Sequence, residues 1–148
     1  MESFALNARK FPGSLTSLAD IRHYISQVAQ HAGLDKHTVY KLCLAVDEIV
    51  TNIVVHGYGA SRASGDIFIS TQVTDASLSV VVEDEGPPFD PHAFKLPSDK
   101  DLKKPLDSRQ PGGLGVLLAF ESVDKLLYER IGNRNKNIFI VNRQAEKS

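Results

Sequence analysis

Apolar residues recur at helical spacing in two segments of the first third of the chain. The first segment runs through 18–32, and Gly33 can end its helix in the left-handed conformation. The second begins after Asp35, a plausible N-cap, and its apolar stripe continues until Gly57. Both segments therefore predict amphipathic helices that bury one face.

The middle of the chain changes to a period of two. Apolar and polar residues alternate through 67–73 and again through 78–84, and four turn-forming residues at 74–77 separate the two runs. This pattern is typical of an antiparallel hairpin with one buried face. We therefore expect two paired strands here.

The last third begins with a long stretch, 86–111, in which no period persists. It holds most of the chain's seven prolines and a run of mixed charge. A loop of this length is usually functional or disordered. After it, Gly112 opens a short apolar helix through Phe120, and two strands at 123–130 and 137–141 flank a polar turn.

The order of these elements, preceded by a short edge strand at 4–8, predicts the fold class. Two helices, a hairpin, a loop, a helix and a hairpin suggest an α+β two-layer sandwich, with a mixed, mostly antiparallel sheet covered by helices on one face. The length of 148 residues fits one domain spanning 1–148.

Composition excludes several classes of function. The net charge is −1, from 17 basic and 18 acidic residues, so we expect no nucleic-acid partner. One cysteine excludes an internal disulfide and a multi-cysteine metal site. No apolar run approaches the length of a membrane span, so we expect no membrane partner and a cytoplasmic location.

Glu48 and Asn52 depart from plain amphipathic packing on the second helix. They are four residues apart and share a face that is well separated from the apolar stripe. That face mixes polar and apolar residues, unlike an ordinary solvated surface. A solvated pair of side chains remains the alternative.

Asp84 lies on the same face of its strand as three apolar residues. A buried carboxylate is unfavourable unless it is hydrogen-bonded, so it is a natural acceptor for the N–H donors of a ligand. An Asp that only caps the next turn is the alternative.

Gly113, Leu114 and Gly115 precede the short apolar helix. Glycines permit close approach of the backbone, and the helix start offers free N–H groups suited to phosphate. An ordinary glycine turn is the alternative, because the segment matches neither a Walker A loop nor a dinucleotide fingerprint.

Together these three places resemble the GHKL (Bergerat-fold) ATPases, and within them the anti-sigma-factor serine/threonine kinases. The resemblance rests on Glu48-x-x-x-Asn52, Asp84-x-Gly86, a long lid and Gly113-x-Gly115. It covers essentially the whole chain, including the segments AVDEIVTN at 45–52, HGY at 56–58 and EDEGPPFDP at 83–91.

The resemblance implies ATP and Mg²⁺ as cofactors. It implies that Asn52 is the Mg²⁺ ligand, Glu48 the catalytic base and Asp84 the acceptor of the adenine amino group. Gly86 would let the chain pass the base, and residues 86–111 would be the ATP lid.

The resemblance also implies the nucleotide's second contact and the partners. Gly113, Leu114 and Gly115 would hold the phosphates. The expected partners are an anti-anti-sigma-type protein substrate, a sigma factor and a second copy of the chain in a homodimer.

Two positions depart from the family pattern. Arg109 stands three residues before Gly112, further than the family's arginine, which leaves its reach to the γ-phosphate open. Where related ATPases often have a Thr near the start of the last strand, this chain has residues 135–137, Asn-Lys-Asn, to which the sequence assigns no role.

Three functions are therefore considered. The first is an Mg·ATP-dependent protein serine/threonine kinase that regulates a small partner. The second is an ATP-gated binding switch without significant phosphotransfer, and the third is an interaction domain that binds no nucleotide. The intact motifs favour the first.

Overall fold

The computed structural model describes residues 4–5, 8–59, 65–93 and 113–143. The strands are β1 (Phe4–Ala5), β2 (Arg9–Pro12), β3 (Asp66–Val73), β4 (Ser77–Asp84), β5 (Lys125–Ile131) and β6 (Arg134–Asn142). The helices are α1 (Leu18–His31), α2 (Lys36–Asn52) and α5 (Gly113–Ser122), with short helical turns η1 (Leu15–Ser17), η2 (Ile53–Tyr58) and η3 (Pro91–Ala93).

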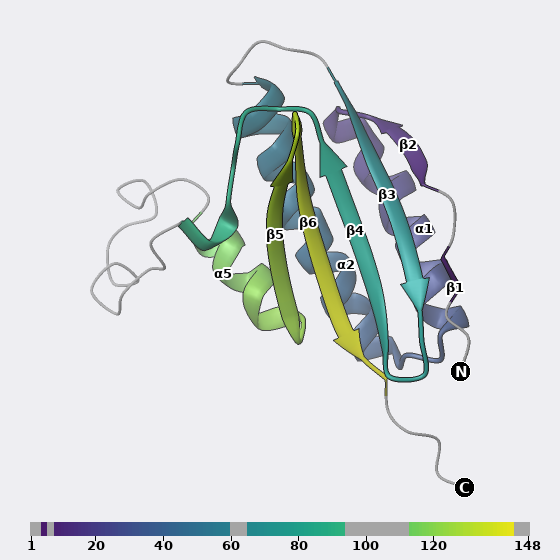
Figure 1. Cartoon of the computed structure of the whole chain (residues 1–148). Helices are drawn as coiled ribbons and strands as arrows, with labels where there is room; N and C mark the ends of the chain where they lie inside the picture. The colour runs from purple at the N-terminus through teal and green to yellow at the C-terminus, as the bar shows by residue number, and fades with distance from the viewer. Residues whose placement is uncertain (1–3, 6–7, 60–64, 94–112, 144–148) are drawn as a thin grey trace, which may run out of the picture.

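The strands form one sheet in the order β1-β3-β4-β6-β5, and β2 pairs with β3 beside β1 (Figure 1). Each of these pairings is antiparallel. The two predicted hairpins are present as β3–β4 and β5–β6, with β6 placed between β4 and β5. Because β4 and β6 pair antiparallel, the end of β4 lies beside the start of β6.

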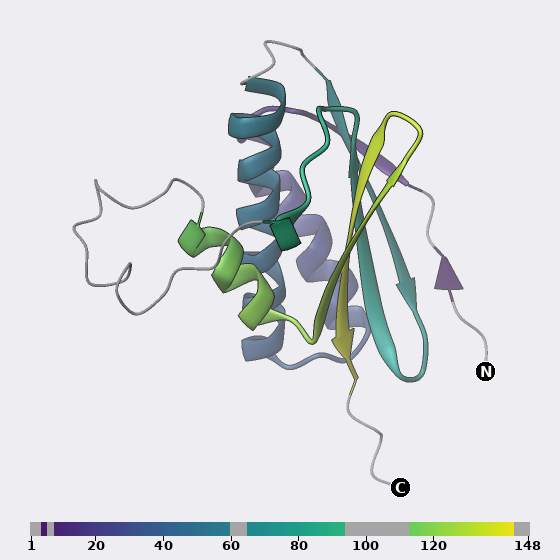
Figure 2. The ribbon, with the colours of Figure 1, turned by 60° about the vertical axis from the view of Figure 1, so that its left-hand side comes forward.

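The three long helices lie on one face of the sheet and leave the other face uncovered (Figure 2). Alternate residues of β4 and β6 point toward the helices and are buried, as the period of two predicts. The α+β two-layer class is thereby confirmed. The largest fully buried side chains include Phe139, Ile21, Ile25, Leu42, Ile67, Ile69 and Leu78.

Local signals in the sequence set the ends of the helices. The carboxylate of Asp35 accepts a hydrogen bond from Thr38 N at 2.7 Å, which caps the start of α2. Gly33 has a φ of 82°, so it ends the α1 region in the left-handed conformation. After Asn52 the helix continues as the wider π-helical turn η2, which reaches Tyr58.

Two boundaries differ from the prediction by more than two residues. Of the edge strand expected at 4–8, the structure describes Phe4–Ala5 as β1, and Arg9–Pro12 forms a further strand, not predicted, that also pairs with β3. Strand β6 begins at Arg134 rather than at 137, because Gly132, with a φ of 60°, turns the chain within two residues. Asn135 is therefore in the sheet, opposite Asp84.

Within the described ranges, we find no helix with the length and apolarity needed to cross a membrane. The predicted lid beyond residue 93, with Arg109, lies outside the described residues. The short helix expected after the glycines is present as α5.

Replacement of Gly33 by Ala should destabilise the fold by about 1 kcal/mol, because a β-carbon disfavours the left-handed conformation. Urea unfolding followed by circular dichroism measures the change. Gly33→Asn should lose clearly less, since Asn tolerates this conformation. Equal losses for Ala and Asn would contradict this explanation.

Candidate functional site

Asp84 is the last residue of β4, and its side chain lies on the face that the helices cover. The residue is 2% exposed. Its Oδ1 accepts hydrogen bonds from Gly86 N at 2.9 Å and from Asn135 Nδ2 at 3.0 Å. Its Oδ2 is buried and has no partner among the described residues. One oxygen therefore caps the following turn, while the other remains available to a donor that the described chain does not supply.

Burial and the neighbouring polar groups have opposite effects on the pKa of Asp84. Burial raises the pKa of Asp84 above its ordinary value, because the charged form is poorly solvated. The hydrogen bonds from Asn135 and Gly86, and the positive charge of Arg130, act in the opposite direction. A further N–H donor at Oδ2 would stabilise the charged form and complete the site.

Asn135 is the residue that holds the turn after β4. Its Nδ2 donates to Asp84 Oδ1 and, at 2.8 Å, to the carbonyl of Pro87. Its Oδ1 accepts from Phe89 N at 3.1 Å and from the hydroxyl of Tyr128. No role for Asn135 follows from the sequence alone. The available signal was the alternation that places Asn135 and Asn137 on the same inward face as the apolar Phe139 and Val141.

Tyr58 supports the same turn from the helical side. Its hydroxyl donates to the carbonyl of Asp66 at 2.7 Å and accepts from Glu85 N at 2.8 Å. The ring lies against the α-carbons of Gly13 and Gly65, where a β-carbon would overlap it. Tyr58 therefore ties the end of η2 both to β3 and to the turn, a role that sequence reasoning missed.

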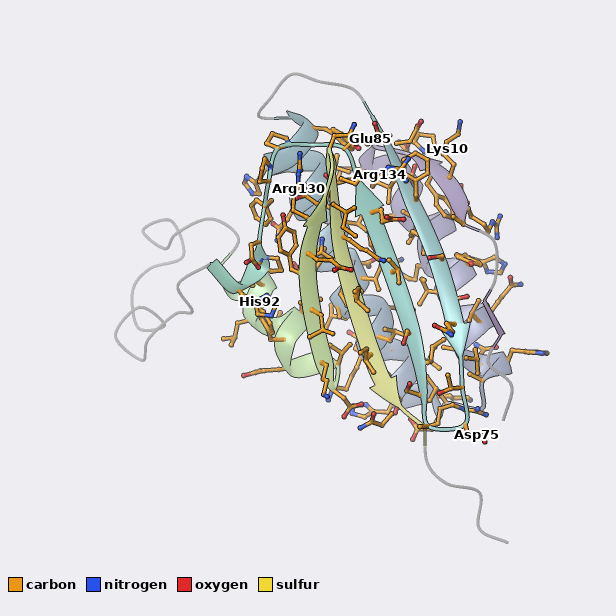
Figure 3. All side chains as sticks on the ribbon, in the orientation of Figure 1. Lys10, Asp75, Glu85, His92, Arg130 and Arg134 are labelled. Atoms are coloured by element: carbon orange, nitrogen blue, oxygen red, sulfur yellow. The ribbon has the colours of Figure 1, made fainter. Side chains whose placement is uncertain are left out.

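Charged side chains gather at this end of the sheet. Figure 3 shows Glu85, Arg130 and Arg134 there. Arg134 lies 3.5 Å from Glu85, and Arg130 donates from its NH1 to the carbonyl of Gly86 at 2.8 Å. The turn that follows Asp84 is thus held by side chains from β5 and β6.

Glu48 lies on α2 against the start of α5. A β-carbon at Gly115 would overlap Glu48 Oε2, so a larger residue there would displace the carboxylate from this position. Burial raises the pKa of Glu48, and the negative charge of Asp47 raises it further. Asp47 is itself paired with Arg22 of α1, whose Nε and NH2 lie 3.1 and 2.6 Å from one carboxylate oxygen. The arrangement favours a Glu48 that can take up a proton.

Asn52 follows Glu48 by one helical turn and is 5% exposed. Its Nδ2 is buried and has no partner among the described residues. The alternative of a solvated Asn is therefore wrong. The described residues contain no cluster of three or more His, Cys, Asp or Glu that could hold a metal ion. A metal here would depend on an Asn and on groups that a ligand brings.

The segment from α2 through η2 contacts predicted site residues at two separate points. At one point Glu48 meets Gly115, and further along the carbonyl carbon of Gly57 and the ring of Tyr58 lie 3.8 and 3.7 Å from the position of a β-carbon on Gly86. Asn52 stands between these points in the sequence. Gly113 is the first residue of α5, and the side chain of Leu114 lies outside the described part of the structure.

Comparison with protein families matches residues 11–141 to the histidine kinase-like ATPase domain. The chain belongs to this family. The match includes both ends of the site, from the helix that carries Glu48 and Asn52 to the strand that carries Asn135. The family resemblance expected from the motifs is thus confirmed.

Within the histidine kinase-like ATPases, the chain is similar to the serine-protein kinases RsbW of Staphylococcus aureus. The proteins of strains JH9 and Newman are 31% identical to it over 127 residues, which is 83% of this chain and 79% of each relative. The similarity therefore extends over most of both proteins.

A solved structure supports the fold. The crystal structure of the RsbU and RsbW domains of Rv1364c from Mycobacterium tuberculosis matches 98% of this chain with a TM-score of 0.61 and 15% sequence identity. The chain spans about a third, 34%, of that longer chain. At this identity the likeness concerns the fold alone, the one expected of a histidine kinase-like ATPase.

Tyr58→Phe should leave Glu85 N and the carbonyl of Asp66 without their partner, which destabilises the fold by about 1–3 kcal/mol. It should also speed hydrogen exchange of the Glu85 amide. Tyr40→Phe is the control, because Tyr40 is 66% exposed. If both variants unfold at the same denaturant concentration as the original protein, Tyr58 does not tie the turn in this way.

Proposed function

We propose that this chain is an Mg·ATP-dependent protein serine/threonine kinase that acts as an anti-sigma-factor-type regulator by phosphorylating a small partner protein. The observation that carries the proposal is the course of α2 and η2. This one segment places Glu48 against Gly115 and, ten residues later, packs Tyr58 near Gly86. The same segment therefore carries the proton acceptor Glu48 and, through Tyr58, supports the turn that follows Asp84 on β4.

The adenine end of the proposed site is Asp84. An adenine amino group is an N–H donor, and the buried, unpartnered Oδ2 is the acceptor that it needs. Guanine has a carbonyl oxygen at the same place, which an ionised carboxylate disfavours. The carboxylate therefore supports ATP rather than GTP, and Gly86 keeps the turn beside it narrow.

The phosphate end is the start of α5. Its free N–H groups suit the phosphates, and Gly113, Leu114 and Gly115 supply the backbone there. Asn52 would hold Mg²⁺, whose remaining ligands are phosphate oxygens and water, in keeping with its preference for few protein ligands. When bound, Mg²⁺ would neutralise the negative charge on the phosphates, including the charge that develops on the leaving group during transfer.

The transfer step assigns one proton to Glu48. The hydroxyl oxygen of a partner's Ser or Thr attacks the γ-phosphorus, the bond to the bridging oxygen breaks, and ADP leaves. Glu48 accepts the hydroxyl proton, for which its raised pKa is suited. Residues 86–111 would cover the nucleotide as a lid, and Arg109 lies within that segment.

The proposed partners follow the family resemblance. The substrate is an anti-anti-sigma-type protein, a sigma factor is a second partner, and the requirement for ATP fits the cytoplasm. A homodimer is supported by the uncovered face of the sheet, where strand alternation places the exposed side chains of Leu127 and Ile131.

Glu48→Gln should lower phosphotransfer by about a hundredfold or more, because the variant cannot accept the proton. The assay combines labelled ATP, Mg²⁺ and a candidate anti-anti-sigma protein. ATP binding, measured by calorimetry, should persist in the variant, since Glu48 is assigned to the transfer of the phosphoryl group and not to recognition of adenine.

Glu121→Gln on α5 is the matched control, because Glu121 is exposed. Tight ATP binding without any transfer by the original protein would contradict the kinase and favour the ATP-gated switch. If Glu48→Gln leaves the rate of phosphotransfer unaltered, the assignment of Glu48 as the catalytic base is wrong.

Asp47→Asn should extend phosphotransfer to lower pH. The transfer needs ionised Glu48, so it is lost as pH falls through the raised pKa of Glu48. Removing the neighbouring negative charge lowers that pKa and moves the acid limb of kcat/KM downward. Asp75→Asn makes the same change of charge at the opposite end of the sheet from Glu85 and should not move the limb (Figure 3). A limb that is unmoved, or moved upward, in Asp47→Asn would argue against this coupling.

A further inference from the structure

Asn135 uses every hydrogen-bonding position that its amide offers. Both N–H groups are donated, one to Asp84 Oδ1 and one to the carbonyl of Pro87. Both acceptor positions of its oxygen are taken, by Phe89 N and by the hydroxyl of Tyr128. These partners also determine which way the amide faces. A flipped amide would place its oxygen against two acceptors and its nitrogen against the N–H of Phe89.

The fixed amide has a consequence for Asp84. Both donors that reach this carboxylate, from Asn135 and from Gly86, arrive at Oδ1. Oδ2 is left as a buried acceptor without a partner among the described residues. With Oδ1 held from two directions, the carboxylate has little freedom to turn Oδ2 away.

From this geometry we propose that Asn135 is a positioning residue for nucleotide choice, which sets adenine over guanine by holding the Asp84 carboxylate in one orientation and in its ionised form. The inference rests on the proposed binding of ATP at Asp84, and it assigns the discrimination to a pair of residues rather than to Asp84 alone.

Ionisation is the part of this role that can be separated from packing. The hydrogen bond from Asn135 lowers the pKa of Asp84, against the larger effect of burial. Without that donor the pKa rises further, and the carboxyl group becomes protonated at a higher pH. A protonated Asp84 accepts poorly from the adenine amino group and can donate to the carbonyl oxygen of guanine.

Other charged or titratable groups surround the same carboxyl. Arg130 of β5 favours the ionised form and donates to the carbonyl of Gly86. Tyr58 of η2 lies on the helical side, where its hydroxyl accepts from Glu85 N, and the Glu85 carboxylate lies 3.5 Å from Arg134. Tyr128 of β5 reaches Asp84 only through Asn135. The residue paired with Asp84 on β3 is the apolar Ile67. Asn135 is therefore the one side chain, among the described residues, that donates directly to this carboxylate.

The experiment compares Asn135→Leu and Asn135→Asp with the unchanged protein. Asn135→Leu removes the donor at similar volume, whereas Asn135→Asp keeps the shape and places a second acid beside Asp84. Calorimetry with Mg·ATP and Mg·GTP from pH 5 to pH 8.5 gives affinities, and carboxyl ¹³C NMR follows the titration of Asp84 without nucleotide. Asn142→Leu, at the exposed far end of β6, is the matched control.

We expect the pH midpoint of Asp84 to rise by about one unit or more in both variants, as for the loss of a hydrogen bond to a charged group. ATP affinity should fall about tenfold near the acid end of the range and recover toward pH 8.5. The preference for ATP over GTP should narrow at acid pH in the variants alone.

Two results would overturn the inference. The first is a variant in which the midpoint and the ATP-to-GTP ratio are unchanged. The second is an equal loss of ATP affinity at every pH, which is what a purely structural role predicts. If the unchanged protein binds no ATP, the proposed function fails instead, and the Asp84 titration still reports whether Asn135 controls the carboxylate.

Discussion

The site depends on one constraint, which is the burial of the Asp84 carboxylate with hydrogen bonds to only one of its two oxygens. Asp84 ends a central strand, where removal from water disfavours its charge. The fold offsets this with two hydrogen bonds to the same oxygen, one from the backbone and one from Asn135. The second oxygen stays buried without a partner among the described residues, and it is the acceptor that the proposed function assigns to a ligand.

The turn that contains this carboxylate is assembled from parts that are distant in the sequence. Tyr58 supports it from the helical layer, Asn135 from β6 and Arg130 from β5. Each of these contacts fixes a backbone group of the turn, and Asn135 also donates to the carboxylate. The orientation of the acid therefore depends on the packing of the helices onto the sheet and not on the turn alone.

Helix α2 has the corresponding role at the other end of the proposed site. Its apolar stripe packs in the core, which fixes the rotation of the helix and so the direction of Glu48 and Asn52. At Gly115 the absence of a β-carbon leaves the Glu48 carboxylate in place beside the start of α5. Membership of the histidine kinase-like ATPases accounts for the combination of these features in one chain.

The sequence by itself determined the local structure and the candidate residues. Periods of 3.6 and 2, the cap at Asp35 and the left-handed Gly33 act within a few residues, so they can be predicted without the fold. Only the tertiary structure decided how Asp84 is completed. Asn135 lies 51 residues away and meets it because β6 pairs with β4. The same strand pairing, together with a tighter turn than the sequence suggested, moved Asn135 from an expected loop into the site. Long-range pairing depends on how whole elements pack, and no local pattern encodes it.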